Sequence, residues 1–302
     1  MRTAVVFNPA AAGRDPSERR ADIRSALTTA GYSPEWFETT ASDAGDGMAR
    51  KLIDDGVELL FVAGGDGTVM ACATALAGSG IPLALLPGGT GNLLALNLGI
   101  PLDLDQAIAV ALRGSRRTID VCDMGTHKFV VMAGLGFDAA MFRDTSPTLK
   151  KFVGPIAYVV SGLKHVRSEA TEVTVRIDDG PPIAQEAHLV LVGNLGRIQG
   201  GLVVLPAARP DDGLLHVAVV KAGSLFSWIR VAIRLLRKVE GNDSRVRIWS
   251  GKRVEVATRR PLPMQLDGDV VGETNRLVVE IRPATLTLCV PKGQSSDGRG
   301  KV

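Results

Sequence analysis

The segment that decides the fold is Leu59-Leu60-Phe61-Val62-Ala63-Gly64-Gly65-Asp66-Gly67-Thr68. Its first five residues form an unbroken apolar run, which is typical of a strand buried on both faces of a sheet. The glycines that follow permit a tight turn and close approach of the backbone to a ligand. Ala71–Leu76 then continues with a helical composition. A buried strand, a glycine turn and a helix in this order predict one unit of a parallel α/β sheet.

The same rhythm extends across the first 120 or so residues. Apolar strand patterns alternate with stretches in which apolar residues recur at helical spacing. The predicted strands are Thr3–Phe7, Glu35–Thr39, Leu59–Ala63 and Leu83–Leu86, and the predicted helices include Ser17–Ala30 and Asp43–Asp55. This half is therefore expected to form a Rossmann-like α/β domain with a parallel sheet.

The rhythm changes after Arg113, where strand patterns dominate and predict a β-rich, sandwich-like second domain. The predicted strands are Ile119–Met124, Phe129–Ala133, Val173–Ile177, Ala187–Val192, Leu214–Val220, Val246–Trp249, Val254–Ala257, Leu277–Ile281 and Leu286–Val290. Two or three helices are expected among them, at roughly Pro147–Val166 and Ser224–Val239. The predicted divisions are residues 1–122, residues 123–291 and a flexible tail at 292–302.

Composition limits the possible partners. Hydrophobic residues make up 45% of the 302 and charged residues 22%, as in a soluble globular protein. A net charge of +3 gives no reason to expect nucleic-acid binding. The three cysteines show no metal-ligand spacing and indicate buried thiols in a reducing compartment. The N-terminus lacks a signal-peptide pattern, so a cytoplasmic protein is expected, with contact at the inner face of the membrane as an open alternative.

Three glycine-rich turns directly follow predicted strands: Asn8–Gly13, Gly64–Thr68 and Pro87–Asn92. All three would lie at the carboxyl ends of parallel strands, where open α/β sheets bind ligands. Exposed amides at a helix start favour phosphate there. We therefore predict a phosphate site rather than three unrelated tight turns. Asp66 would contact a cation or take a proton, and it is also a plausible helix cap.

Neither common phosphate motif is present. No G-x-x-x-x-G-K-[ST] occurs, and no G-x-G-x-x-G follows the first strand. The pattern therefore disfavours both a P-loop enzyme and an ordinary dehydrogenase.

The combined motifs resemble the diacylglycerol kinase catalytic-domain family, which includes soluble bacterial lipid kinases and sphingosine and ceramide kinases. The resemblance runs from Asn8 to Pro291. It is carried by the three glycine turns above and by motifs in the second half. These are Gly136–Ala139, Gly193-Asn194, Pro210–Leu215 and Gln265–Asp269. The family implies ATP as donor and a lipid hydroxyl as acceptor, most simply diacylglycerol giving phosphatidic acid.

The resemblance also implies roles for individual residues. ATP contacts would come from Asn8, Pro9, Gly13, Thr40 (or Thr39), Gly64, Gly65, Asp66, Gly67, Thr68, Gly89, Thr90 and Asn92. The family's Asp-Gly-Glu, whose glutamate is the proton acceptor, corresponds to Asp267-Gly268-Asp269. The base therefore remains open between Asp269 and Asp267, with Asp66 as a third candidate. A Mg²⁺ site would map to Asp212 and the carbonyls of Arg209 and Leu214.

Two features bear on the acceptor. Leu93 and Leu96 stand where the family often has Asp and Arg, which could alter the acceptor pocket. Ser224–Val239 has a basic side and an apolar side with Trp228. Packing on the core is the favoured interpretation of this helix, and contact with a membrane surface is the alternative. The sequence does not fix the oligomeric state, and a homodimer is one option.

Two alternatives stay open. An NAD kinase shares the Gly-Gly-Asp-Gly-Thr motif, but the Asn8-Pro9 opening and the turns at Pro87–Asn92 and Asp267–Asp269 argue against it. A non-catalytic lipid-binding protein on the same fold is disfavoured by the intact phosphate turns. The shorter acid at Asp269 keeps that alternative open.

Overall fold

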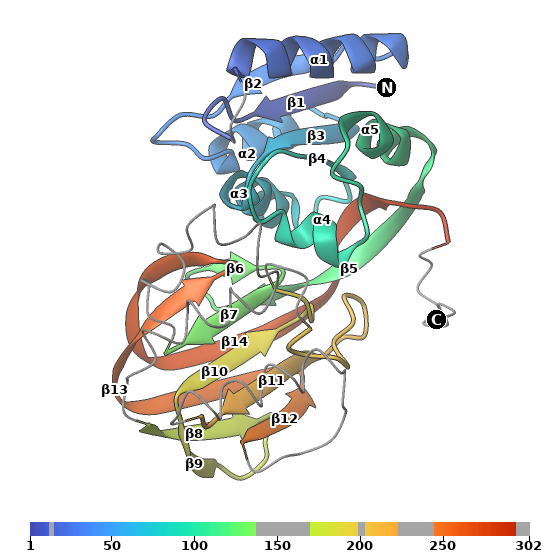
Figure 1. Cartoon of the computed structure of the whole chain (residues 1–302). Helices are drawn as coiled ribbons and strands as arrows, with labels where there is room; N and C mark the ends of the chain where they lie inside the picture. The colour runs from blue at the N-terminus through green and yellow to red at the C-terminus, as the bar shows by residue number, and fades with distance from the viewer. Residues whose placement is uncertain (12–14, 137–169, 199–202, 223–244, 294–302) are drawn as a thin grey trace, which may run out of the picture. The chain divides into compact units, whose positions relative to one another are not determined.

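The computed structural model describes residues 1–11, 15–136, 170–198, 203–222 and 245–293 (Figure 1). The predicted helices Pro147–Val166 and Ser224–Val239, the candidate Gly13 and residues 294–302 of the predicted tail lie outside the described residues. The described part divides into two compact units. The first comprises Met1–Val121 and Pro283–Val302, and the second comprises Cys122–Arg282.

The first unit is built on a parallel sheet. Its strands β1 (Thr3–Phe7), β2 (Glu35–Glu38), β3 (Leu59–Gly64) and β4 (Leu83–Pro87) lie in the order β2-β1-β3-β4. Val5 pairs with Trp36 on one side and with Phe61 on the other, so β1 is central. Beyond β4, the end of β14 (Asp269–Val290) adds a parallel pair at Leu288 and Leu83, and β5 (Ser115–Asp123) pairs with β14.

Helices cover both faces of this sheet, as the sequence predicts. Helices α1 (Pro16–Thr29) and α5 (Leu104–Arg113) contribute Ile23 and Ile108 to a core with Phe7 and Phe61. Helices α2 (Asp46–Asp54) and α3 (Asp66–Leu76) pack on each other and on β1, β3 and β4. Every residue of β1 and β3 is buried, which explains their unbroken apolar runs. Helix α4 (Leu93–Asn97) is short.

The second unit is antiparallel. Strands β7 (Met132–Leu135), β10 (Leu189–Gly193), β11 (Leu215–Val220) and β12 (Val246–Gly251) follow one another in the order β12-β11-β10-β7. The long β13 (Arg253–Leu266) pairs with β7 at one end and with β8 (Thr171–Ile177) at the other. Strands β9 (Ile183–Ala187) and β6 (Lys128–Phe129) extend the edges. Val217 of β11 and Val256 of β13 share one core, so the unit is sandwich-like (Figure 1).

The C-terminal boundary differs from the predicted one. The predicted second domain ended at 291, but Pro283–Val290 belongs to the first unit because that part of β14 pairs with β4 and β5. The predicted strands Leu277–Ile281 and Leu286–Val290 are one strand of 22 residues. Ala284 lies between them with φ 51°, and its N–H donates to the Asp120 carboxylate (2.8 Å). This left-handed residue is where the apolar alternation breaks.

Cys72, Cys122 and Cys289 are buried and unbridged, as predicted. Burial, with Asp43 and Asp46 nearby, raises the pKa of the Cys72 thiol to about 12. Within the described residues, no helix combines the length and the hydropathy that crossing a bilayer requires.

Candidate active site

The three glycine turns follow β1, β3 and β4 at their carboxyl ends, so the parallel register brings them to one edge of the sheet. Asn8 links the first turn to the second. Its N–H donates to the Ala63 carbonyl (2.9 Å), and its Nδ2 donates to Thr68 Oγ1 (2.8 Å). Its own Oδ1 accepts from the Ala10 N–H (2.9 Å). Thr68 is buried, so its hydroxyl serves this link in the structure, and its contact with ATP stays a prediction.

Asp66 is the first residue of α3, and Gly65 is the N-cap. The Asp66 Oδ1 accepts from the Leu93 N–H at 2.6 Å, and Leu93 is the first residue of α4. The acid of the second turn therefore caps the helix that follows the third turn. The two roles predicted for Asp66, a helix cap and a functional carboxylate, are compatible with each other, because a carboxylate has further lone pairs.

The third turn is held by Asn92, whose φ is 47°. Its Oδ1 accepts from the Gly89 N–H (3.0 Å), and its Nδ2 donates to the Gly89 carbonyl (2.7 Å). Gly89 also comes so close to the second turn that a Cβ there would lie 2.6 Å from Gly65 Cα. Asn92 and Gly89 are thus required by the geometry of the turn. Their contact with phosphate stays a prediction.

Arg19 of α1 is a cation at these turns that the sequence analysis did not single out. Its guanidinium donates to the carbonyls of Ala11, Gly88 and Leu86, each at 3.3 Å. It therefore joins the first and third turns from the helix side. The chain has many arginines, and only the contacts of Arg19 with residues 69 and 67 positions away distinguish it, so no local signal could have identified it.

Other residues predicted to contact ATP are Thr40, Thr90, Pro9 and Gly67. Thr40 is exposed beyond β2, and its hydroxyl accepts from the Asp43 N–H (3.1 Å). Thr90 is exposed at the third turn. Pro9 and Gly67 lie in their turns as predicted, with Gly67 exposed. These positions are accessible, and their contact with ATP stays a prediction.

The candidate acceptor turn lies in the second unit, between β13 and β14. Leu266 pairs with Asp269, so Asp267 and Gly268 form a two-residue hairpin turn. Their φ values are 50° and 102°, which explains the glycine at the second position. Gln265 is buried and accepts the Gly268 N–H on its Oε1 (2.9 Å). Asp269 follows at the start of β14 and is exposed.

The two acids of this turn differ in environment. Asp267 is 4% exposed, and its carboxylate accepts three backbone N–H groups, from Val130 (3.1 Å), Val131 (3.0 Å) and Met132 (2.6 Å). Asp269 presents its carboxylate to solvent. The next residues are apolar yet exposed, Val270 by 46% and Val271 by 38%.

The predicted metal ligands lie in the loop before β11. Asp212 Oδ1 accepts from the Leu214 N–H (2.9 Å), and Oδ2 lies 3.0 Å from His216 Nε2. Each oxygen of the Asp212 carboxylate has one hydrogen-bond partner here, which leaves lone pairs that could bind a cation. Among the described residues no cluster of three or more His, Cys, Asp or Glu side chains forms a metal site. Mg²⁺ at Asp212 would therefore rely on backbone carbonyls such as those of Arg209 and Leu214, and on water, which suits this ion.

Comparison with known families identifies both halves of the chain. Residues 2–124 match the model of the diacylglycerol kinase catalytic domain. Residues 130–290 match the model of the YegS C-terminal NAD kinase beta sandwich-like domain. A probable YegS-like lipid kinase of Pseudomonas putida is 33% identical over 283 residues, covering 90% of this chain and 91% of the relative. A diacylglycerol kinase of Bacillus subtilis is 28% identical over 275 residues, covering 90% of each.

Solved structures show the same fold. A putative diacylglycerol kinase from Bacillus anthracis superposes with a TM-score of 0.77 at 24% identity, covering 96% of both chains. An NAD kinase from Archaeoglobus fulgidus in complex with ATP gives a TM-score of 0.50 at 15% identity, over 96% of this chain and 93% of that one. The predicted fold class, an NAD-kinase-like α/β domain followed by a β sandwich-like domain, is confirmed, and so is the resemblance stated from the motifs.

Proposed function

This chain belongs to the diacylglycerol kinase catalytic-domain family of lipid kinases, and on that premise we propose that it transfers the γ-phosphoryl group of ATP to the hydroxyl of diacylglycerol. The products are phosphatidic acid and ADP. The family uses ATP, so the donor follows from membership. The acceptor is the finer part of the proposal.

The observation that carries the acceptor is the exposed start of β14. An ionised acid that takes a proton from an alcohol must be reachable, and Asp269 is exposed. Val270 and Val271, next to it, expose apolar surface that would be better removed from water. An acid followed by two exposed valines suits an acceptor with a hydroxyl group beside hydrocarbon. A dinucleotide such as NAD offers no hydrocarbon of this kind.

The roles then follow from chemistry. Asp269 accepts the hydroxyl proton while the hydroxyl oxygen forms its bond to the γ-phosphorus and the bond to the leaving ADP oxygen breaks. The amides of the glycine turns and the guanidinium of Arg19 supply positive potential for phosphate oxygens. Mg²⁺ would neutralise phosphate charge, and Asp212 with the carbonyls of Arg209 and Leu214 would hold a Mg²⁺ ion. Contact with a bilayer surface is part of the proposal, since diacylglycerol resides there.

The test incubates the full chain with γ-labelled ATP, Mg²⁺ and diacylglycerol in mixed micelles, with NAD as acceptor in parallel. We expect label in phosphatidic acid and none in NADP. Asp269→Ala should lower turnover by about 10²- to 10⁴-fold, the usual contribution of a general base, with the KM for ATP unchanged.

Label in NADP would favour the NAD kinase alternative. Lipid binding without any label would favour the non-catalytic one. An Asp269→Ala protein with wild-type turnover would remove Asp269 from the mechanism while leaving the kinase activity in place.

A further inference from the structure

The acceptor turn, Asp267-Gly268, has more hydrogen bonds to the rest of the second unit than a two-residue hairpin requires. Besides the Leu266–Asp269 pair, the Asp267 N–H donates to the Met132 carbonyl (2.9 Å). The Asp267 carboxylate accepts hydrogen bonds from the three consecutive amides of Val130–Met132, and the Gln265 side chain accepts one from the Gly268 N–H. A residue with positive φ is thus fixed from its backbone and its side chain at once.

The segment that receives Asp267 is itself fixed. The Val131 carbonyl accepts the N–H groups of Asn194 (3.0 Å) and Leu195 (3.2 Å), which follow β10. Met132 begins β7, and β7 pairs with both β10 and β13. The turn is therefore anchored on the end of an interior strand rather than on a mobile loop.

The geometry points to a division of labour between the two acids of this turn, and we propose that Asp267 is a positioning residue that fixes Asp269 for proton transfer. The inference rests on the proposed function, in which Asp269 is the proton acceptor. Asp267 is unsuited to that task because its oxygens face three backbone amides in a buried site, and a lipid hydroxyl would have to displace them. Misplacement of a reacting group by about 1 Å can cost about 10²-fold in rate.

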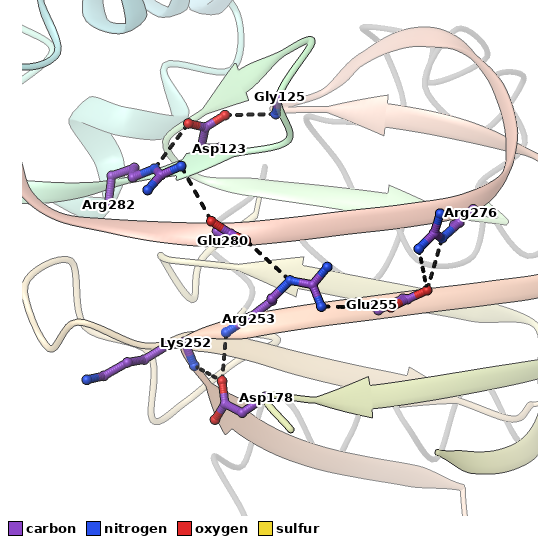
Figure 2. Close-up of polar contacts among 9 residues, drawn as sticks. All are labelled: Asp123, Gly125, Asp178, Lys252, Arg253, Glu255, Arg276, Glu280 and Arg282. Atoms are coloured by element: carbon purple, nitrogen blue, oxygen red, sulfur yellow. Dashed lines mark hydrogen bonds and ion pairs between the residues drawn. The ribbon is translucent and has the colours of Figure 1, made fainter. Parts of the chain in front are cut away.

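The same unit contains a matched control. Asp178 also has φ 50°, its N–H donates to the Arg253 carbonyl (2.8 Å), and its Oδ1 accepts the amides of Lys252 and Arg253, both at 2.8 Å (Figure 2). Asp178 thus ties a turn to the start of β13 by the same contacts, far along that strand from the acceptor turn. Unlike Asp267, it is exposed.

The experiment compares Asp267→Asn with Asp178→Asn. Asparagine keeps one oxygen acceptor but turns an N–H group toward a backbone N–H. At a temperature at which both variants are folded, kcat for diacylglycerol should fall roughly 10- to 100-fold in Asp267→Asn. The KM for ATP should stay unchanged, and kcat in Asp178→Asn should stay within about twofold of the wild type.

Two readouts separate positioning from proton acceptance and from a general structural effect. The decline of kcat toward acid pH should persist in Asp267→Asn and disappear in Asp269→Asn. The double variant Asp267→Asn/Asp269→Asn should be no slower than Asp269→Asn alone, because positioning has no effect once its target is removed.

The inference is overturned if the acid decline vanishes in Asp267→Asn, if the Asp267 effect persists in the double variant, or if Asp178→Asn loses as much activity. A wild type without lipid turnover contradicts the proposed function and this inference with it. An active wild type with an unaffected Asp267→Asn contradicts the inference alone.

Discussion

The Asp66 side chain both caps helix α4 and carries a negative charge. Its Oδ1 accepts the Leu93 N–H and so orders the start of α4, while its charge lies in a turn predicted to hold phosphate. A negative group there is unfavourable toward phosphate unless a cation lies between them or it removes a proton. The two roles can be separated because asparagine retains an oxygen acceptor and removes the charge.

We predict that Asp66→Asn keeps a melting temperature close to the wild-type value and loses roughly 10²-fold or more in phosphoryl transfer. Asp66→Ala should also lose the hydrogen bond to Leu93, at a cost of about 1–3 kcal/mol in the free energy of unfolding. Thermal melts and the γ-phosphate transfer assay measure the two effects.

Asp103 provides the comparison, since its side chain accepts the Gln106 N–H (3.0 Å) as the N-cap of α5, outside the three glycine turns. Asp103→Asn should leave both melting temperature and turnover nearly unchanged. If Asp66→Asn had the same turnover as the wild type, the charge of Asp66 would have no role in phosphoryl transfer, and its role would be that of a helix cap.

At the scale of elements, the acceptor hairpin contains an irregularity that exposes apolar side chains. Pairing passes from Gln265–Val270 to Met264–Gly272, so Val271 is an inserted residue. A bulge breaks the strict alternation of a strand and turns neighbouring side chains to one side. Val270 and Val271 are both exposed, directly after Asp269.

The double substitution Val270→Thr/Val271→Thr tests contact of these side chains with the lipid. Threonine keeps the branched shape and replaces a methyl group by a hydroxyl group. The KM for long-chain diacylglycerol should rise roughly 10-fold, as expected for removing about two apolar groups from the contact. The KM for a short-chain analogue and for ATP should change little. Leu102→Thr, at a side chain that is 59% exposed in the first unit, serves as control and should change neither KM.

An equal rise for short and long chains would contradict contact with the hydrocarbon. Loss of vesicle binding without substrate dependence would assign the valines to the membrane surface instead.

Local sequence patterns predicted most helices and strands. Features that depend on contacts between distant parts of the chain could not be predicted in this way. The run Leu59–Thr68 identified β3, its turn and α3 because burial on both faces and the glycine turn are local properties. Helix α5 is absent from the predicted helices although Asp103 supplied a cap signal. The role of Asp267 could not be read locally, since its partner Met132 is 135 positions away in the chain. The motif identified the turn, and only the fold distinguishes its two acids.

At the scale of the whole molecule, the chain passes between the two units twice, at Val121–Cys122 in β5 and at Arg282–Pro283 in β14. Beside these passages, within the second unit, Arg282 Nε donates to Asp123 Oδ2 (3.1 Å). From there, alternating charges continue over the strands through Glu280, Arg253, Glu255 and Arg276 (Figure 2). Most members are substantially exposed, so each such pair contributes little.

Asp123 is the least exposed member, with 17% of its side chain accessible, followed by Glu255 at 22%. The Gly125 N–H and then Arg282 hold the pKa of its carboxyl below the ordinary value. A carboxyl whose pKa is lower in the folded state stabilises the fold above its unfolded pKa, and this contribution is lost as pH falls through the folded pKa.

We therefore predict that Asp123→Asn lowers the melting temperature at pH 7 by about 2–4 °C, corresponding to about 1 kcal/mol. As the pH falls through the folded pKa of Asp123, the difference from wild type should shrink. Glu186→Gln, which breaks the exposed Glu186–Lys221 pair of the same unit, should shift the melting temperature little over the same pH range. A deficit in Asp123→Asn that persists unchanged at low pH would show that packing or backbone geometry, rather than the charge of Asp123, stabilises the strands at these passages.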